Sequence, residues 1–213
     1  IAGALTLRDG GLPWKSLDCH TSGPLNPATL LLTIPLGLPL DYVGARVLAS
    51  LLQAAAVLAL WGAARRLVPE WAARLAVLPA VNLWACRWFH DLGQYSSETT
   101  PVFLLSLAGW AGAAALTTNR PRLGRALFLI AGSLATLPFF AKPQSLPLAG
   151  TLWLLLLIAV WRAPAAPSTR DRLWQSGALA LGAVLPVAVF FGYILLYGLM
   201  AQVRIFFWQS NLL

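Results

Sequence analysis

The chain is poor in charge, in cysteine and in histidine. Only 10% of its 213 residues are charged, whereas soluble domains carry about 25%. It has two cysteines and two histidines, and they do not show the spacing of a zinc site. The sequence contains no glycine-rich phosphate-binding loop, no GxSxG motif and no HExxH motif. These absences argue against an ordinary soluble domain, a zinc module, a P-loop protein, an α/β-hydrolase and a zinc protease.

What the chain has in abundance is long apolar runs. Of its residues, 59% are hydrophobic. Five runs of about 17 to 26 residues carry almost no charge and can cross roughly 30 Å of hydrocarbon as helices. They are residues 43–64, 99–117, 123–141, 145–161 and 175–200. A sixth run, residues 71–88, is weaker because Arg74, Pro79 and Asn82 interrupt it. We predict an all-α polytopic membrane protein with about six transmembrane helices.

The positive charge gathers in alternate connections between these runs. The connections around residues 65–74, 120–125 and 162–172 hold nine basic residues and two acids, and the others hold six basic residues and five acids. By the positive-inside rule, this balance of +7 against +1 predicts that the first group is cytoplasmic and the second outside. Both histidines belong to the outer group. We therefore expect a multi-pass protein of the plasma (inner) membrane with its active site on the extracytoplasmic face.

The net charge of +8 does not indicate a nucleic-acid partner. Such a site gathers Lys and Arg on one water-exposed face, whereas here short connections between apolar runs carry them. The tryptophans favour a membrane, because most stand near the ends of the runs, as in the aromatic belts of membrane interfaces. These are Trp14, Trp61, Trp71, Trp84, Trp88, Trp161, Trp174 and Trp208.

Residues 24–40 are apolar, but the run is short and rich in proline. Pro27 could open a helix at its first turn, and Pro35 would kink or end that helix. A run of this length is more often interfacial or re-entrant than spanning, so we expect a juxtamembrane helix flat on the outer leaflet. The chain is then one transmembrane domain, with an outer loop (1–42), a six-helix bundle (43–200) and an outer tail (201–213).

The strongest candidate site is the outer stretch RWFHDLGQYSSE, residues 87–98. Two interpretations of Glu98 are open. In one it is a helix-dipole partner in a first turn capped by Ser96 or Ser97; in the other it is an acid at the lipid–water boundary that acts as a base or binds a sugar hydroxyl. His90 is either solvated or a catalytic or metal-binding group. Asp91 adjoins His90, but neighbours on a helix point in different directions, so the two are no automatic dyad.

Three further residues are candidates for binding a phosphate. Lys142 is the only charge in the turn Lys142-Pro143-Gln144. It is either a snorkelling lysine or a partner for a lipid phosphate at headgroup depth, with Gln144 lining the same site. Arg204 in the outer tail either anchors its helix end at the headgroups or contacts phosphate.

The outer loop before the flat helix supplies weaker candidates. Asp18, His20 and Asn26 are its polar side chains. Asp18 and His20 share a face only in extended chain, so they indicate an acceptor-side loop, and any metal stays unknown. Cys19 and Cys86 both map to the outer side. A disulfide between them and two unpaired cysteines are both open, because sequence does not give their distance.

Five segments follow one another in a familiar order: DGGLPWKSLD (9–18), SGPLNPATLL (22–31), GARVLASLL (44–52), SSETTPVFLL (96–105) and AKPQSLP (141–147). This order resembles the GT-C fold glycosyltransferases, in particular the protein-mannosyltransferase-like and aminoarabinose-transferase-like branch. That branch has a G-x-P-Y/W-x-D stretch in its first outer loop, a proline-led flat helix and an a-R-l start to the next span. The matching residues here are Gly11 to Trp14, Asp18, Pro24-Leu25, Ala45 to Leu48 and, opening a later span, Glu98.

The resemblance implies an integral membrane glycosyltransferase that moves a sugar from a polyprenyl-phosphate donor to an extracytoplasmic acceptor. In such an enzyme Glu98, His90 and Asp91 would serve the reaction, Lys142, Gln144 and Arg204 would hold the donor phosphate, and Asp18 and His20 would line the acceptor side. The resemblance gives no certain cofactor, and a divalent cation is left open. Membrane lipid and the lipid-linked donor are the expected partners, without nucleic acid; the oligomeric state is unknown.

Two departures from the family pattern bear on activity. The family's principal catalytic Asp ends the first transmembrane helix, which would lie upstream of Ile1. We therefore expect a piece of a longer protein, missing at least one helix in front and inactive alone. A basic residue often precedes the flat helix in the family, whereas Thr21, Ser22 and Gly23 stand here; its phosphate role would pass to Lys142.

The rival interpretation is a transporter or flippase of a lipid-linked or anionic substrate. That class places charged residues inside its spans, and here only Arg46 and Arg74 come near, both close to span ends. A structural subunit without catalysis is a third class.

Overall fold

The computed structural model describes residues 1–17, 19, 22–86, 95–162 and 168–204, with no side chains described for residues 83–86. Within these ranges every regular element is a helix. Five helices are long and apolar enough to cross a membrane. The prediction of an all-α polytopic membrane protein is confirmed.

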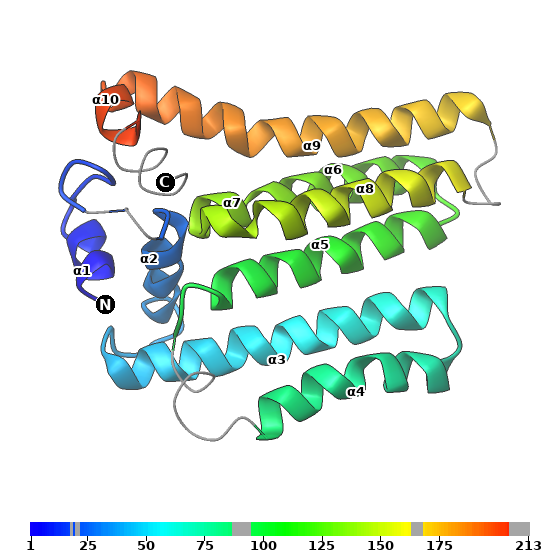
Figure 1. The fold of residues 1–213 in the computed structure, drawn as a ribbon, viewed down its shortest axis with the longest axis horizontal. Helices are drawn as coiled ribbons and strands as arrows, with labels where there is room; N and C mark the ends of the chain where they lie inside the picture. Colours follow the sequence, from blue (N-terminus) through cyan, green and yellow to red (C-terminus); the bar gives the residue numbers. More distant parts are fainter. Residues whose placement is uncertain (18, 20–21, 87–94, 163–167, 205–213) are drawn as a thin grey trace.

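Six helices lie side by side and form a bundle (Figure 1). They are α3 (Tyr42–Leu67), α4 (Glu70–Cys86), α5 (Thr99–Thr117), α6 (Pro121–Thr136), α8 (Leu146–Arg162) and α9 (Thr169–Leu196). Consecutive helices run in opposite directions, so α3, α5 and α8 all start at one end. The short helices α1 (Ala2–Arg8), α2 (Leu25–Leu30) and α10 (Met200–Val203) lie at that same end. We call it the Lys142 end, and the opposite one the Arg122 end.

The predicted sixth span forms α4, which packs against α3. It has 17 residues with Pro79 inside, which gives a length of about 25 Å against roughly 30 Å of hydrocarbon. It is therefore not among the five spans, whereas α6 together with α7 gives a span of 21 residues (Pro121–Ala141) and η2 together with α8 one of 20 residues (Pro143–Arg162). It packs along α3 and returns the chain toward the Lys142 end, as the predicted alternation requires.

The predicted span 123–141 is divided where proline enters it. Helix α6 ends at Thr136, and a short helix, α7 (Pro138–Ala141), follows after Leu137. Pro138 has no N–H for the carbonyl four residues back, and its ring clashes with that turn. A 3₁₀ turn, η2 (Pro143–Ser145), then leads into α8. The division bends the chain just ahead of Lys142.

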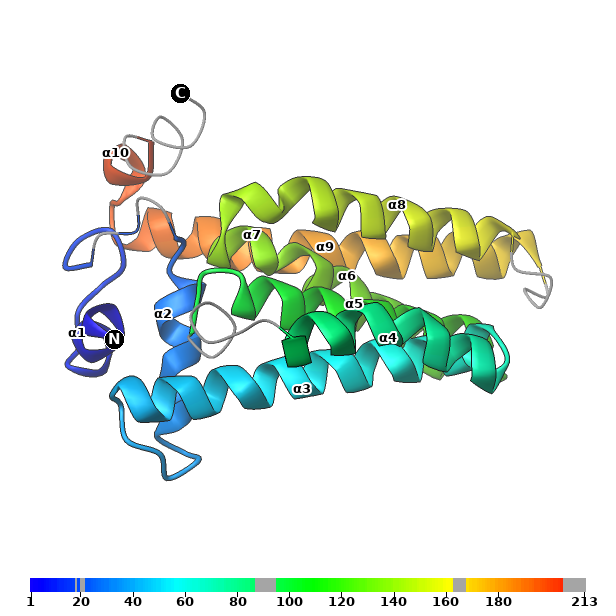
Figure 2. The same ribbon diagram turned by 60° about the horizontal axis from the view of Figure 1, so that its bottom comes forward.

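The proline-rich segment does not span. It forms α2 and a 3₁₀ turn, η1 (Leu31–Thr33), which ends before Pro35 as expected. Both views show α2 lying across the bundle axis beside the start of α3 (Figures 1 and 2). This agrees with a flat helix, although α2 begins at Leu25, ahead of Pro27.

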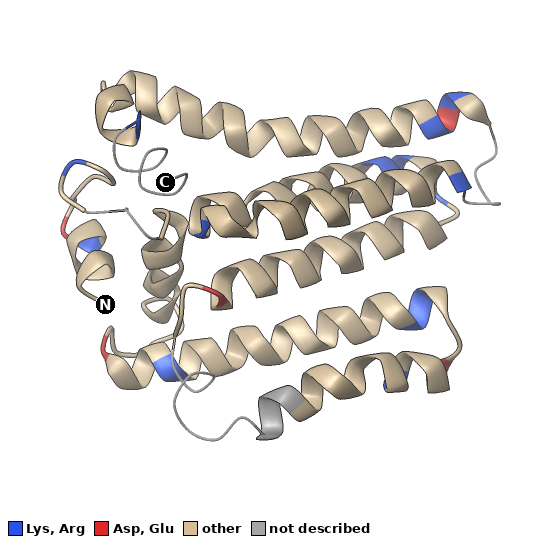
Figure 3. Ribbon diagram, in the orientation of Figure 1, with Lys and Arg blue, Asp and Glu red and all other residues tan. Residues whose placement is uncertain are grey.

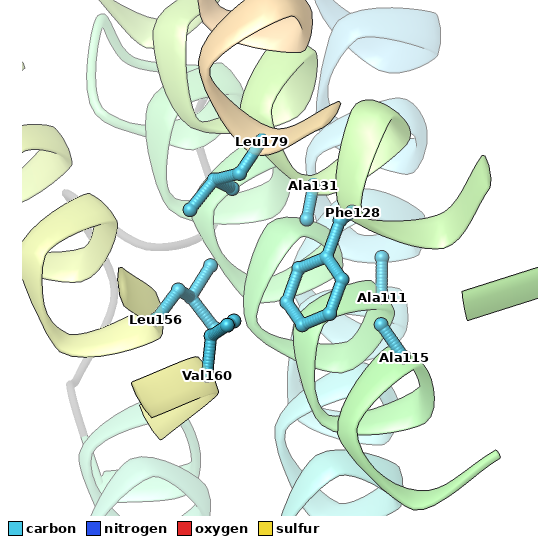
Figure 4. Close-up of a cluster of buried hydrophobic side chains, with 7 residues drawn as sticks. All are labelled: Ala111, Ala115, Phe128, Ala131, Leu156, Val160 and Leu179. Carbon is cyan, nitrogen blue, oxygen red and sulfur yellow. The ribbon is translucent and has the colours of Figure 1, made fainter. Parts of the chain in front are cut away.

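The bundle core lies between α5, α6, α8 and α9. Figure 4 shows Phe128 of α6 facing Ala111 and Ala115 of α5, with Leu156, Val160 and Leu179 around it. Helices α6 and α9 pack backbone to backbone at Gly182. A Cβ on this residue would lie 2.0 Å from the carbonyl oxygen of Leu129. Small residues at such contacts allow the backbone-to-backbone packing that is common between membrane helices.

The two ends of the bundle differ in charge. Figure 3 shows most Lys and Arg at the Arg122 end, near the connections α3–α4, α5–α6 and α8–α9. Among the described acids, Asp9, Asp41 and Glu98 belong to the Lys142 end, and Glu70 and Asp171 to the other. The described helices thus separate the charged groups as the loop count predicted.

Candidate functional site

The Lys142 end brings together two residues predicted to serve a site. The ammonium of Lys142 donates a hydrogen bond to Oε1 of Glu98, which makes an ion pair between residues 44 positions apart. Glu98 stands directly before α5, and Lys142 lies between α7 and η2. The Lys142 side chain is 26% exposed and that of Glu98 57% exposed. The pair therefore has one half-buried partner and one that faces solvent.

Backbone bonds fix the position of Lys142. Its N–H donates to the carbonyl of Pro138 at 2.8 Å, and its own carbonyl accepts from the N–H of Ser145 at 2.9 Å and from the Ser145 hydroxyl at 2.7 Å. Lys142 itself is extended, with φ −154°. It is the single extended residue between α7 and η2, and these backbone bonds fix where its side chain starts.

The predicted capping of α5 is wrong in detail. The helix starts at Thr99, so Glu98 is its N-cap residue and not part of its first turn, and no side chain caps it. Instead the Thr99 hydroxyl accepts from the N–H of Ser96 at 3.2 Å. The Glu98 carboxylate does not cap the helix and bonds to Lys142. This bond from the ammonium is the largest cause that lowers the pKa of Glu98 to about 2.

A buried polar cluster lies next to Glu98 and connects α2 to α5. The Tyr95 hydroxyl donates to the carbonyl of Asn26 at 2.7 Å and shares a 2.7 Å bond with the hydroxyl of Thr100. Because the Tyr95 proton goes to Asn26, Thr100 is the donor in the shared bond, and its hydroxyl also lies 3.3 Å from Oδ1 of Asn26. Burial raises the pKa of Tyr95 to about 12, so its hydroxyl stays protonated. The cluster fixes the flat helix against the residues that precede α5.

A second contact fixes the flat helix near Lys142. The N–H of Gly23 donates to the carbonyl of Ala141 at 2.8 Å. A Cβ on Gly23 would lie 2.0 Å from the carbonyl oxygen of Phe140, so only glycine fits this approach. The residues next to Glu98 and the residue before Lys142 are therefore each hydrogen-bonded to the segment that begins α2.

An apolar groove of about 210 Å³ adjoins this region. Helix α7, which leads directly to Lys142, forms one wall, and α9 and α10 form the others. Among the described residues, Arg204 is the one charged residue that lines it, and Arg204 is exposed. The lining residues are Phe139, Phe140, Val187, Phe190, Phe191, Ile194, Met200, Val203 and Arg204. The groove thus combines an aromatic surface with a guanidinium.

The remaining predicted site residues divide into two groups. Gln144 is exposed in η2, two residues from Lys142. His90, Asp91, Asp18 and His20 lie outside the described residues. Among the described residues, no three His, Cys, Asp or Glu side chains gather as metal ligands. Cys19 is buried, and the side chain of Cys86 is outside the described part, so their pairing is not tested.

Sequence analysis did not find the groove, and it misjudged Trp14. Trp14 was expected at a membrane interface, but it is 5% exposed and packs edge-on against Phe190 with ring centroids 5.2 Å apart. The available signal was a pair of Phe-Phe doublets, one at 139–140 near the predicted outer end of a span and one at 190–191 in the outer half of another. Trp161 and Trp174, in contrast, are exposed as an interfacial belt requires.

Comparison with known proteins adds no identification. No protein-family model, no curated protein and no solved structure matches the chain. The case for a function therefore depends on the geometry of the Lys142 end.

Proposed function

We propose that this chain is part of a membrane glycosyltransferase that takes a sugar from a polyprenyl-phosphate donor and passes it to an extracytoplasmic acceptor. The observation that supports it best is the apolar groove with Arg204 in its wall, because α7 forms another wall of the groove and leads to Lys142 of the Glu98–Lys142 pair. A lipid-linked sugar has an apolar chain, an anionic phosphate and a polar sugar. The Lys142 end offers a surface of matching chemistry for each part.

The groove suits the first prenyl units of the donor. Phe139, Phe140, Phe190 and Phe191 give it an aromatic lining, and the volume of about 210 Å³ holds a few prenyl units, not a whole chain. The rest of the lipid would lie along the apolar outer face of α9, which is mostly exposed. Arg204 can bind the phosphate at the rim, since guanidinium and phosphate form charge-assisted hydrogen bonds.

Lys142 is the second cation for the donor phosphate, and Gln144 is the neighbouring hydrogen-bond donor. In the structure the ammonium is already paired with Glu98. A donor phosphate would compete for the ammonium and release the carboxylate. Glu98 could then accept a hydrogen bond from a sugar hydroxyl. The exposed position of Glu98 and the half-buried one of Lys142 permit this exchange.

The reaction breaks the bond between C1 of the sugar and the phosphate oxygen. An acceptor hydroxyl forms the new bond to C1, its proton passes to a base, and polyprenyl phosphate leaves with its negative charge. Glu98, with a pKa of about 2, is a weak base near neutral pH. We assign it to orienting hydroxyls, beside His90 and Asp91. The family resemblance gives the base role to an Asp at the end of a first transmembrane helix, and Asp18 and His20 to the acceptor side.

The proposal is tested by the retention of polyprenyl phosphate. Native mass spectrometry of the purified protein in detergent would count polyprenyl phosphate bound by wild type, by the Lys142→Met and Arg204→Gln double variant, and by Arg66→Gln at the Arg122 end. We expect retention in wild type and Arg66→Gln, and about a tenfold loss in the double variant. Equal retention in all three would contradict the donor site.

The same preparation distinguishes the rival transporter or flippase. In vesicles, a transporter shows counterflow of its substrate without covalent change. A glycosyltransferase consumes the lipid-linked sugar and releases polyprenyl phosphate. Counterflow without release would favour the rival.

A further inference from the structure

The Arg122 end carries a concentration of positive charge that the proposed reaction does not use. Arg120 and Arg122 stand at the start of α6, Arg162 ends α8, and Arg170 is in the first turn of α9. All four are exposed. Figure 3 shows blue segments gathered at this end of the bundle, away from α1, α2 and α10.

The packing of α6, α8 and α9 holds these arginines on one surface. Arg125 of α6 reaches Asp171 of α9, with 3.5 Å from Nη2 to Oδ1, and its guanidinium lies 5.7 Å from the centre of the Trp174 ring. Val160, two residues before Arg162, is buried against Phe128 and Leu179 in the core of Figure 4. Side-chain contacts thus connect the end of α8 and the starts of α6 and α9, which carry the exposed arginines.

Nothing in the described part of the chain neutralises this surface. Asp171, its one acid, accepts from the Ser168 hydroxyl at 2.7 Å and already pairs with Arg125. Within the described residues Arg122, Arg162 and Arg170 make no ion pair. Residues 163–167 are alanine and proline only, so the connection supplies no acid.

Exposed apolar side chains border the arginines. Trp161 precedes Arg162 and is 43% exposed; Trp174 is 54% exposed, and Leu123 and Leu173 are likewise exposed. A free phosphate ion would make no use of such an apolar border. A phospholipid needs both parts, cations at headgroup depth and apolar groups where its acyl chains begin.

We propose that the Arg122 end binds the headgroup of an anionic phospholipid, held by Arg122, Arg162 and Arg170. Basic pockets between membrane helices bind such headgroups, and each Lys or Arg near an anionic surface contributes measurably to the attraction. The site is at the opposite end of the bundle from the proposed donor site. It therefore does not depend on the proposed function, and either can fail without the other.

The test compares lipid retention by the purified protein after reconstitution in vesicles of phosphatidylcholine with 20 to 30% phosphatidylglycerol or cardiolipin, roughly the fraction at which anionic lipids give a membrane its surface potential. The protein is re-extracted, and bound lipid is counted by mass spectrometry. We expect wild type to be enriched in the anionic lipid. The triple variant Arg122→Gln, Arg162→Gln and Arg170→Gln should lose about tenfold or more of that enrichment.

Three controls make the result specific. The triple variant Arg122→Lys, Arg162→Lys and Arg170→Lys keeps the charge and should keep most of the enrichment, which also controls for folding. Lys15→Gln with Arg46→Gln removes cations from the other end and should leave the enrichment unchanged. In wild type, raising the salt from about 0.05 to 0.5 M should weaken it, since screening shortens the range of the attraction.

Other outcomes would overturn the proposal. Equal anionic lipid on wild type and the glutamine triple variant would show that these arginines serve topology alone. An equal loss in the Lys15 and Arg46 variant would show a response to net charge and not to a site. If inorganic phosphate raised the unfolding temperature as much as the anionic vesicles did, the ligand would be a free anion and not a lipid.

Discussion

Lys142 donates a hydrogen bond to the carboxylate of Glu98 and so connects the turn before α8 with the start of α5. The two residues are the acid and the cation at the centre of the proposed site. A substrate that binds either group therefore competes with this ion pair. This relationship gives the first two predictions.

Replacing Glu98 with Gln should reduce glycosyl transfer by the full-length protein strongly, on the order of a hundredfold. The carboxylate that orients a hydroxyl is lost, while the amide keeps the shape. Membrane insertion should be unchanged. The measurement is transfer in isolated membranes, normalised to protein content. Activity equal to that of wild type would refute the assigned role of Glu98.

The ion pair should also appear in the pH dependence of stability. The pKa of Glu98 falls from 4.5 to about 2 in the folded chain, so its contribution is complete above pH 4.5 and is lost as the pH falls toward 2. Because Glu98 is 57% exposed, the contribution is about 0.5 kcal/mol. Unfolding temperatures between pH 5 and 2.5 (roughly the range of that titration) should decline less in Glu98→Gln than in wild type. Parallel declines would argue against the pair.

Removing the Tyr95 hydroxyl should destabilise the Lys142 end. Tyr95→Phe leaves the carbonyl of Asn26 and the hydroxyl of Thr100 without their shared partner, at a cost of about 1 to 3 kcal/mol. The matched control is Tyr42→Phe, because Tyr42 is 79% exposed and should be neutral. Thermal unfolding in detergent measures both variants. A neutral Tyr95→Phe would show that the cluster does not hold α2.

The contact between α6 and α9 should tolerate no added methyl group. Gly182→Ala would bring a Cβ to 2.0 Å from the carbonyl oxygen of Leu129 and should cost about 1 to 3 kcal/mol or more, since backbone must shift. Gly177→Ala, in the same helix, meets nothing within 4 Å and should be neutral or slightly stabilising. Equal unfolding temperatures for the two variants would contradict this packing.

Most of the fold could be predicted from hydropathy and charge. The run 99–117 coincides with α5, because Thr118 leaves helical geometry just where the apolar residues end. The run 175–200 was placed too late, since α9 starts at Thr169. Ser168 accepts from the N–H of Asp171 and caps the helix, so charged residues join the first turn. A hydropathy profile locates the apolar residues but does not detect a capping residue, so it missed the first turn of α9.

The site was predictable only in part. Glu98 was predicted at the start of a span and Lys142 as the only charge in its turn, but their pairing depends on how α5 and α7 pack, which no local pattern records. Tyr95 and Asn26 stand 69 positions apart and were likewise not expected as partners. The groove was missed because four phenylalanines from two helices and Arg204 meet only in the folded chain.

The central claim is that the two ends of the bundle lie on opposite sides of a membrane, with the Glu98–Lys142 pair outside. Single cysteines at Gln144 and Asn119, both exposed, test it in a background with Cys19→Ser and Cys86→Ser. A membrane-impermeant thiol reagent added to intact cells should label Gln144→Cys, and should label Asn119→Cys only after permeabilisation. Labelling of both positions from the same side would contradict the account.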